Sequence, residues 1–397
     1  MHRLFFFLTV IGFFTTITFI VRFLLRKANQ KIWQNRALDR AAYFYPYFFL
    51  FSFVLILLSS NLGRQHILLQ ISITLGFAML ILSITLFLSF LVVFVYYFIF
   101  KLLTKLKTEP RPVSAERRRV LKWTASVAPV FLLATSGKGF AGAFSPVRTP
   151  VIPFHFSKLP AAFEGFRILH LSDLHLGYYF NLKDLEQFVA RMARQTFDLV
   201  VVTGDCADDV DQLPAALRLI EQIPARLPKF FSLGNHEYYR DLPRTLKILE
   251  RSSIRLLRNE AVELMHNGRK MRLVGIDDPV YMGREINSYL ENFLLQVSKK
   301  SKPRAFNLLM SHRPQALDLA PQFGMDLVLA GHTHGGQVGF KGRSVFENWG
   351  IHKYLWGKYQ NGASQLYTSA GMGQWLPFRL GCPPEAPIII LKKSGVT

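Results

Sequence analysis

Eight polar side chains of kinds that bind metal ions follow short apolar runs in this 397-residue chain. Five such runs end in the motifs "SDLHLG", "GDCADD", "GNHE", "SHRP" and "GHTHGGQ". The motifs supply two carboxylates, one amide and five imidazoles: Asp173, His175, Asp205, Asn235, His236, His312, His332 and His334. Burying so many polar groups without compensation costs several kcal/mol for each one. Divalent cations would supply that compensation, so the pattern predicts a metal site.

The number of candidate ligands suits two ions. A carboxylate can bridge two cations that lie roughly 3.5–4 Å apart, and Asp205, alone on its strand, suits that place. The two cysteines, Cys206 and Cys382, are too few for a thiolate zinc site or a disulfide framework. A mixed set of nitrogen and oxygen ligands disfavours a pure Mg²⁺ or Ca²⁺ site. Mn²⁺ is therefore favoured, with Fe and Zn²⁺ as alternatives.

Three glycines of "GHTHGGQ" let the backbone turn sharply and approach the site closely. In an extended turn, His332 and His334 would share one side-chain direction, while Thr333 would point away. Both imidazoles are therefore expected to reach the same site.

Alternating strands and helices must position these residues. The apolar runs are short and rich in Val, Ile and Leu, which is typical of buried strands. Helix-like patterns lie between the first three runs, at residues 182–194 and 213–223. This alternation predicts an α/β fold. Ligands bind at the carboxyl ends of strands in open α/β sheets, and the polar motifs lie at those ends.

Together and in this order, the motifs resemble those of the calcineurin-like metallophosphoesterases over residues 150–397. The resemblance implies an α/β fold with four layers, a β-sandwich of two mixed sheets flanked by helices. It assigns one metal ion to three residues: Asp173, His175 and His334. It assigns a second ion to three others: Asn235, His312 and His332. Asp205 would bridge the ions, and His236 would act as a general acid near the leaving group without binding metal.

Two acidic features beside the motifs are interpreted as structural. Glu237 stands where many members of the family have Asp, at a position that does not bind metal directly. The acidic run of Asp208, Asp209 and Asp211 is interpreted as a solvated loop.

The short first motif, "GHTHGGQ" and the closing "PFRLGCPPEAPIIIL" are most similar to a membrane-associated bacterial branch of the family. That branch includes twin-arginine-exported phosphodiesterases and UDP-2,3-diacylglucosamine pyrophosphatases. The resemblance implies a metal-dependent hydrolase of a phosphodiester or pyrophosphate bond, with a phosphorylated small molecule or lipid as substrate. The alternative is a catalytically silent membrane sensor or assembly protein that uses this domain for binding.

Residues 1–100 are interpreted as a helical transmembrane region. Apolar runs at residues 4–25, 43–60 and 67–100 each reach the roughly 20 residues that span a bilayer. The third run is expected to form one long helix, with two short helices as the alternative. Core helices of a soluble protein are the competing interpretation, which runs of this length disfavour.

The distribution of charge predicts an orientation in the membrane. Before Pro150 the chain has 18 basic and 3 acidic residues, so 15 of its 22 net positive charges lie there. These charges punctuate apolar runs, a pattern that indicates a lipid bilayer as partner and argues against nucleic acid. Basic residues are frequent at 26–42, sparse at 61–66 and frequent at 101–122. The alternation places residues 101–122 in the cytoplasm.

Residues 101–149 are interpreted as a basic linker with a short fourth hydrophobic segment. The linker contains "RRRVLK", residues 117–122, followed by modest hydrophobicity at residues 123–136. This arrangement resembles an internal twin-arginine export signal. Export would place the 150–397 domain on the extracytoplasmic face of a multi-pass protein of the bacterial cytoplasmic membrane. The alternative is a basic linker that leaves this domain in the cytoplasm.

The aromatic and basic segment at residues 346–362 has two interpretations. The favoured one is a loop packed beneath the site. The other is an interfacial rim that grips a lipid, because Trp and Tyr favour the membrane boundary.

Overall fold

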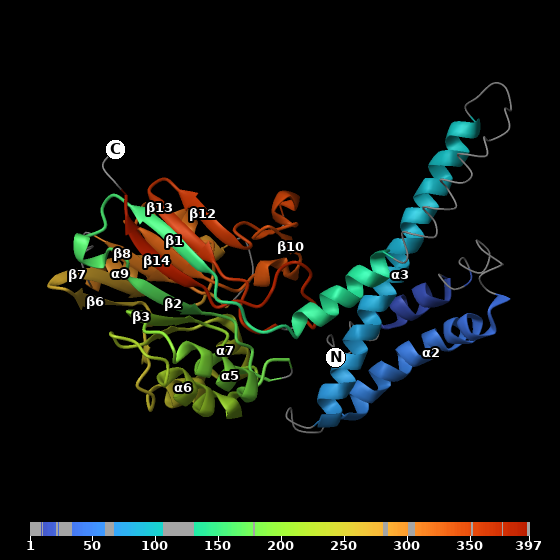
Figure 1. Ribbon diagram of the computed structural model, residues 1–397, viewed down its shortest axis with the longest axis horizontal. Helices are drawn as coiled ribbons and strands as arrows, with labels where there is room; N and C mark the ends of the chain where they lie inside the picture. Colours follow the sequence, from blue (N-terminus) through green and yellow to red (C-terminus); the bar gives the residue numbers. More distant parts are fainter. Residues whose placement is uncertain are drawn as a thin grey trace. The chain divides into compact units, whose positions relative to one another are not determined.

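The computed structural model describes residues 9, 11–20, 23, 34–59, 67–105, 131–177, 179–280, 285–300, 306–350, 352–374 and 376–394 (Figure 1). The chain divides into two compact units, Met1–Ala141 and Gly142–Thr397. The second unit carries all eight of the polar residues selected from the motifs.

The first unit consists mainly of helices in its described part. The helices are α2 (Arg36–Ser59) and α3 (Ile67–Lys105), and residues 11–20 and 131–141 are also helical. α3 continues without a break through the whole of the third apolar run. α2 and α3 pack through buried Phe49 and Met79, and a hydrogen bond of 2.7 Å joins the Tyr45 and Ser83 hydroxyls.

Among the described residues of the first unit, two helices are long and apolar enough to cross a membrane, namely Asp39–Ser59 and Leu68–Leu88. Only 24% and 28% of these two windows are buried. The core helix of a soluble protein would be mostly buried, so their exposed apolar side chains favour association with a membrane. Much of the first apolar run, and the basic residues 117–122, lie outside the described residues.

The second unit contains two six-stranded sheets. The strands of the first sheet, in spatial order, are β1 (Val151–Phe156), β14 (Ile388–Lys393), β2 (Arg167–Leu171), β3 (Leu199–Thr203), β4 (Phe230–Ser232) and β5 (Arg255–Leu256). Those of the second are β12 (Gly357–Asn361), β13 (Ser364–Thr368), β9 (Leu327–Ala330), β8 (Asn307–Met310), β7 (Arg269–Gly275) and β6 (Glu260–His266). β2, β3 and β4 are parallel neighbours, and so are β7, β8 and β9.

Residues along each strand alternate between two buried cores. Leu199 and Val201 of β3 join the core between the sheets. Val200 and Val202 join the core beneath α5 (Leu182–Met192) and α6 (Leu213–Glu221). Figure 1 shows these two helices against the β2 and β3 side of the unit.

A third core covers the outer face of the second sheet. It contains Val328 of β9 and residues of α9 (Ile286–Lys300) and α10 (Ala316–Leu319). The order of layers is therefore helices, sheet, sheet, helices. The predicted four-layer α/β sandwich is confirmed.

Candidate metal centre

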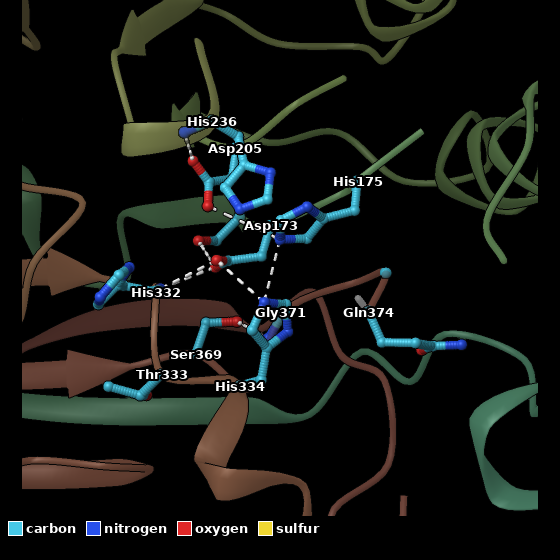
Figure 2. A network of polar contacts seen from close by, with 12 residues as sticks. Asp173, His175, Asp205, His236, His332, Thr333, His334, Ser369, Gly371 and Gln374 are labelled. Carbon is cyan, nitrogen blue, oxygen red and sulfur yellow. Dashed lines mark hydrogen bonds and ion pairs between the residues drawn. The ribbon is translucent and has the colours of Figure 1, made fainter. Parts of the chain in front are cut away.

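Each residue selected from the motifs follows the carboxyl end of a strand, and both sheets contribute. In the first sheet, β2 precedes Asp173 and His175, β3 precedes Asp205, and β4 precedes Asn235 and His236. In the second, β8 precedes His312, and β9 precedes His332 and His334. Figure 2 shows the side chains of Asp173, His175, Asp205 and His334 pointing toward one another. The structure thus brings together residues that are far apart in the chain, such as His175 and His334, which are 159 positions apart.

The first group of possible ligand atoms belongs to Asp173, His175 and His334. The Nε2 atoms of His175 and His334 lie 3.0 Å apart. Asp173 Oδ1 lies 3.6 Å from His334 Nε2. All three residues are buried.

The second group surrounds the Nε2 atom of buried His312. Asn235 Oδ1 lies 3.1 Å from it, and His332 Nδ1 lies 3.2 Å from it. Asp205 Oδ2 is also 3.2 Å away. Asp205, His312 and His332 can therefore share one cation.

Asp205 Oδ2 lies between the two groups. It is 3.2 Å from His312 Nε2 and 3.7 Å from His175 Nε2. The other oxygen, Oδ1, accepts a hydrogen bond of 2.8 Å from the backbone N–H of His236. One carboxylate oxygen thus faces both groups while the other holds the side chain in place.

The donor chemistry of both groups fits a cation. His312 Nδ1 lies 2.8 Å from the Thr203 carbonyl, so this nitrogen carries the proton and donates. Its Nε2 then offers a lone pair, yet its neighbours Asn235 Oδ1 and Asp205 Oδ2 are also acceptors. The same pattern recurs at His175, whose Nδ1 faces Asp208. Lone pairs that converge in this way require a cation or extra protons between them.

The pKa values of His175 and His312 reflect this need for positive charge between the converging lone pairs. Burial alone would lower both, but neighbouring carboxylates reverse the effect. Asp208 raises the pKa of His175 to about 9. Asp205 raises the pKa of His312 to about 10. In the metal-free protein, protons on His175 and His312 supply the positive charge that a bound divalent ion would supply.

Strained backbone holds the residues of the site. Asp173, His175, Asp205, His332 and His334 all have positive φ, between 45° and 72°. Residues other than glycine adopt this region of φ at a cost of about 1–3 kcal/mol each. Such strain persists where the surrounding fold enforces it, and it is typical of functional sites.

The turn after β9 differs from the predicted extended conformation. Thr333 has right-handed helical angles between the left-handed His332 and His334. Both imidazoles nevertheless face the site, and the Thr333 hydroxyl donates away from it to the Leu355 carbonyl. Two glycines continue the turn with φ of 62° and 61°, which agrees with their predicted role.

Asp208 corrects the interpretation of residues 208–211 as a solvated loop. Its buried carboxylate lies 3.2 Å from His175 Nδ1 and 2.5 Å from His236 Nδ1. It also accepts a hydrogen bond of 2.9 Å from Arg240. Burial would raise the pKa of Asp208, but the two imidazoles hold it well below its usual range. Of these three aspartates only Asp211 is exposed, and the sequence alone did not distinguish Asp208 from it.

Glu237 connects two of the loops that form the site. Its buried carboxylate accepts hydrogen bonds of 2.7–2.9 Å from the backbone N–H groups of Asp205, Cys206 and Gly234. These residues follow β3 and β4. Glu237 therefore fixes the position of Asp205 without facing the cation groups.

An ion pair that the sequence analysis did not select contacts His332, although one of its members, Arg313, lies in the motif "SHRP". Arg313 pairs with Asp278 through contacts of 2.9 and 3.2 Å, and both side chains are buried. The remaining guanidinium nitrogen, Arg313 Nη1, lies 2.9 Å from His332 Nε2. This contact turns Nδ1 of His332 toward the second group.

The loop at residues 369–374 closes the site beside Asp173. A Cβ atom on Gly371 would lie 2.7 Å from Asp173 Cβ, so only glycine fits. Buried Arg379 holds the loop by donating to the carbonyls of Ala370 and Gly373 at 2.8 and 2.6 Å.

Comparisons with known proteins agree with this geometry. The model of the calcineurin-like phosphoesterase family matches residues 166–336. The uncharacterized metallophosphoesterase YkuE of Bacillus subtilis is 30% identical over 290 residues, covering 70% of this chain and 98% of that protein. Phosphodiesterase YaeI of Escherichia coli is 27% identical over 285 residues, covering 69% and 98%. A transmembrane protein with metallophosphoesterase domain from Bos taurus is 29% identical over 300 residues, covering 71% and 65%.

The Asp and His groups are positioned for divalent metal, and the similarity to YkuE extends over nearly the whole of that protein. The chain therefore belongs to the calcineurin-like phosphoesterase family and is a metal-dependent phosphoric ester hydrolase.

Proposed function

We propose that this protein is a membrane-anchored phosphoesterase with a binuclear metal centre. Asp173, His175 and His334 would hold one divalent ion. Asn235, His312 and His332 would hold the other. Asp205 would bridge them, and the position of its Oδ2 between the two groups is the observation that carries the proposal. Mn²⁺ is favoured, with Fe and Zn²⁺ as alternatives.

Bound divalent ions would lower the pKa of water at the site and neutralise the charge of the phosphoryl group. His236 would protonate the leaving oxygen. Asp208 fixes its Nδ1, so that Nε2 remains for the substrate. The His236 side chain is 19% exposed, whereas those of His175, His312 and His334 are at most 3% exposed. His236 is thus more accessible to substrate than these three imidazoles, as a general acid must be.

The proposed substrate is a phosphodiester or pyrophosphate, including that of a lipid. The name of the Escherichia coli relative supports a phosphodiester. The apolar helices α2 and α3 and the transmembrane relative support the anchoring. The proposed location of the catalytic domain is the extracytoplasmic face, on the basis of the twin-arginine-like residues 117–122.

Metal content and hydrolysis test the binuclear centre together. The full-length protein, purified in detergent and loaded with Mn²⁺, should contain two ions per chain and hydrolyse an aryl phosphodiester. Asp205→Ala should lose both metal and activity, because the bridging oxygen is removed. Retention of two ions by this variant would refute bridging. A fully loaded wild-type protein that is inert on aryl phosphodiesters and nucleotide-lipids would instead favour a silent binding protein.

A reporter fused after Thr397 tests the location. The reporter is an epitope that antibody reaches in intact spheroplasts only from the extracytoplasmic face, whether the domain is exported folded or unfolded. Antibody binding without lysis is expected. Binding only after lysis would place the domain in the cytoplasm.

A further inference from the structure

Apolar side chains project from the segment that directly follows the metal centre. After His334, the chain forms a small hairpin of β10 (Gly339–Phe340) and β11 (Arg343–Ser344), and then η5 (Glu347–Trp349). Phe340 is 69% exposed and Trp349 is 66% exposed, and Val345 is exposed as well. We call these three residues, together with Lys341 and Arg343, the hairpin surface.

The fold holds the hairpin surface in its exposed position. The backbone N–H of Gly339 donates to the Leu380 carbonyl at 2.8 Å, and that of Val345 donates to the Val338 carbonyl at 3.1 Å. The ring of Phe346 packs edge-to-face on Trp349, with centroids 5.0 Å apart. Phe346 itself lies close against the backbone at Gly336. These contacts therefore hold the exposed rings of Phe340 and Trp349 in place.

The two interpretations of the aromatic segment at residues 346–362 apply to different parts of that segment. Leu355 and Trp356 are buried, and Tyr354 donates a hydrogen bond of 2.6 Å to Asp318. This later part is the predicted packed loop. The earlier part, which includes Trp349, leaves its apolar side chains in solvent. Exposed large apolar groups that cluster in this way mark a surface for a partner.

Charge and side-chain type identify the partner. Exposed Lys341 lies beside the Phe340 ring, with Nζ 5.4 Å from its centroid. Arg343 is exposed on the same hairpin and pairs with Glu347 at 3.3 Å. Apolar aromatic tips flanked by cations match the interface of an anionic bilayer, where Trp is favoured and Lys and Arg meet lipid phosphates. The same chain carries α2 and α3, which are long and apolar enough to cross a membrane.

We propose that the hairpin surface docks onto an anionic lipid surface. Phe340, Val345 and Trp349 enter the headgroup region, and Lys341 and Arg343 contact lipid phosphates. The hairpin continues from η4 (His334–Gln337), which contains the candidate ligand His334. Docking therefore places the metal centre close to the bilayer surface. This inference goes beyond the proposed hydrolysis and does not depend on it.

Depth-dependent fluorescence quenching tests the docking. The full-length Trp349→Cys protein is labelled with an environment-sensitive dye and reconstituted into vesicles of phosphatidylcholine and phosphatidylglycerol that contain nitroxide-labelled lipid. Both native cysteines are buried, and the unsubstituted protein measures any labelling of them. Met265→Cys is the matched control, because Met265 is 58% exposed but lies on β6, outside the hairpin surface.

The label at position 349 should be quenched by the lipid nitroxide and shifted to shorter wavelength, whereas the label at 265 should not. Lys341→Gln with Arg343→Gln should reduce the quenching, and so should high salt, which screens exposed charges. Equal quenching at 349 and 265 would overturn the proposal. Shielding of position 349 in lipid-free detergent that grows with protein concentration would also overturn it, because a second copy of the chain would then be the occupant.

A second pair of substitutions separates docking from folding and catalysis. Phe340→Ser with Trp349→Ser removes the apolar tips and leaves the metal centre intact. Hydrolysis of a soluble aryl phosphodiester should be unchanged, while crosslinking from position 341 to a photoactivatable lipid should be lost. Unchanged lipid crosslinking in this variant would contradict docking through the two rings. The quenching assay needs no substrate, so a failure of the proposed hydrolysis would not affect it.

Discussion

At the scale of single residues, two carboxylates organise the imidazoles of the metal centre. Asp205 directs Oδ2 at the Nε2 atoms of His175 and His312. Asp208 holds the Nδ1 atoms of His175 and His236. His175 thus lies between both carboxylates. His236 forms a further possible ligand group with His175 and Asp208, but it is not one of the seven residues assigned to the two ions.

His236→Ala should separate catalysis from metal binding. Loss of a general acid lowers turnover by roughly 10²–10⁴-fold, while metal content should stay at the wild-type value. The loss should be larger for an alkyl phosphodiester than for a nitrophenyl one, because a good leaving group needs less protonation. Measurement of turnover and metal content on the same samples checks both points. Loss of metal in parallel with activity would contradict the role of His236.

Asp208→Asn should impair the reaction, although Asp208 is not assigned to either of the two metal ions. An amide cannot accept from His175, His236 and Arg240 as a carboxylate does. We expect turnover to fall by at least tenfold, with a shifted pH–rate profile, since the orientation of His236 changes. Asp211→Asn is the matched control, because Asp211 is exposed and pairs only with Arg244 among the described ion pairs. Equal turnover in the two variants would contradict a role for Asp208 in the reaction.

The affinity for metal should rise with pH. His175 and His312 have pKa values of about 9 and about 10 in the metal-free protein. Both are protonated at neutral pH, so metal binding must release their protons, and this competition weakens as pH rises. In the metal-free protein, the stability from these raised pKa values is present below the ordinary pKa of His and is lost as pH rises through 9–10. Calorimetry in buffers of different ionisation enthalpy counts the released protons, and an affinity independent of pH between neutrality and 9 would contradict these values.

At the scale of elements, short loops after parallel strands form the site. Glu237, at the start of α7 (Asn235–Arg240), connects two of these loops. Its carboxylate accepts from three backbone N–H groups, those of Asp205, Cys206 and Gly234. Arg313 and Asp278 act similarly between β8 and the turn after β9, through His332. The positions of the candidate ligands therefore depend on contacts between loops as well as on the strands.

Glu237→Ala should destabilise the second unit. It leaves three buried N–H groups unsatisfied, and each such group costs about 1–3 kcal/mol. Thermal unfolding should show a marked fall in Tm, and Glu237→Gln should lose less because an amide oxygen still accepts. Glu186→Ala on the exposed face of α5 is the control and should leave Tm nearly unchanged. A neutral Glu237→Ala variant would contradict the structural role of these hydrogen bonds.

At the scale of the whole molecule, the chain combines two units of different chemistry. The first presents exposed apolar side chains along α2 and α3, and the second buries its apolar residues in three cores. The carboxyl ends of strands from both sheets of the second unit meet at the metal centre.

The full-length chain should remain in the membrane fraction after alkaline carbonate extraction. The windows Asp39–Ser59 and Leu68–Leu88 are each 21 residues long and apolar, which suits a bilayer-spanning helix. Detergent should release the chain, whereas a salt wash should not. Release by carbonate would contradict anchoring through these helices.

The sequence alone determined the features that depend on chain neighbours. The apolar runs and their polar ends predicted the strands and the placement of Asp173, Asp205 and His312 at strand ends, because a strand and the residue after it are covalently joined. The order of the motifs predicted the family and the four-layer fold. The glycines after His334 predicted a sharp turn, although its extended form was wrong.

The family resemblance predicted which distant residues would share a site, but only the tertiary structure decided which of their atoms meet. His175 and His334 are 159 positions apart, and their 3.0 Å contact requires two sheets to pack with their strand ends aligned. Asp208 is buried because His236 and Arg240 of α7 lie over it, and its own neighbours, Asp209 and Asp211, carry no sign of this. Trp349 and Trp356 share one aromatic segment, yet packing buries one and exposes the other. Burial and long-range contact are properties of the packed layers, and local sequence patterns do not contain them.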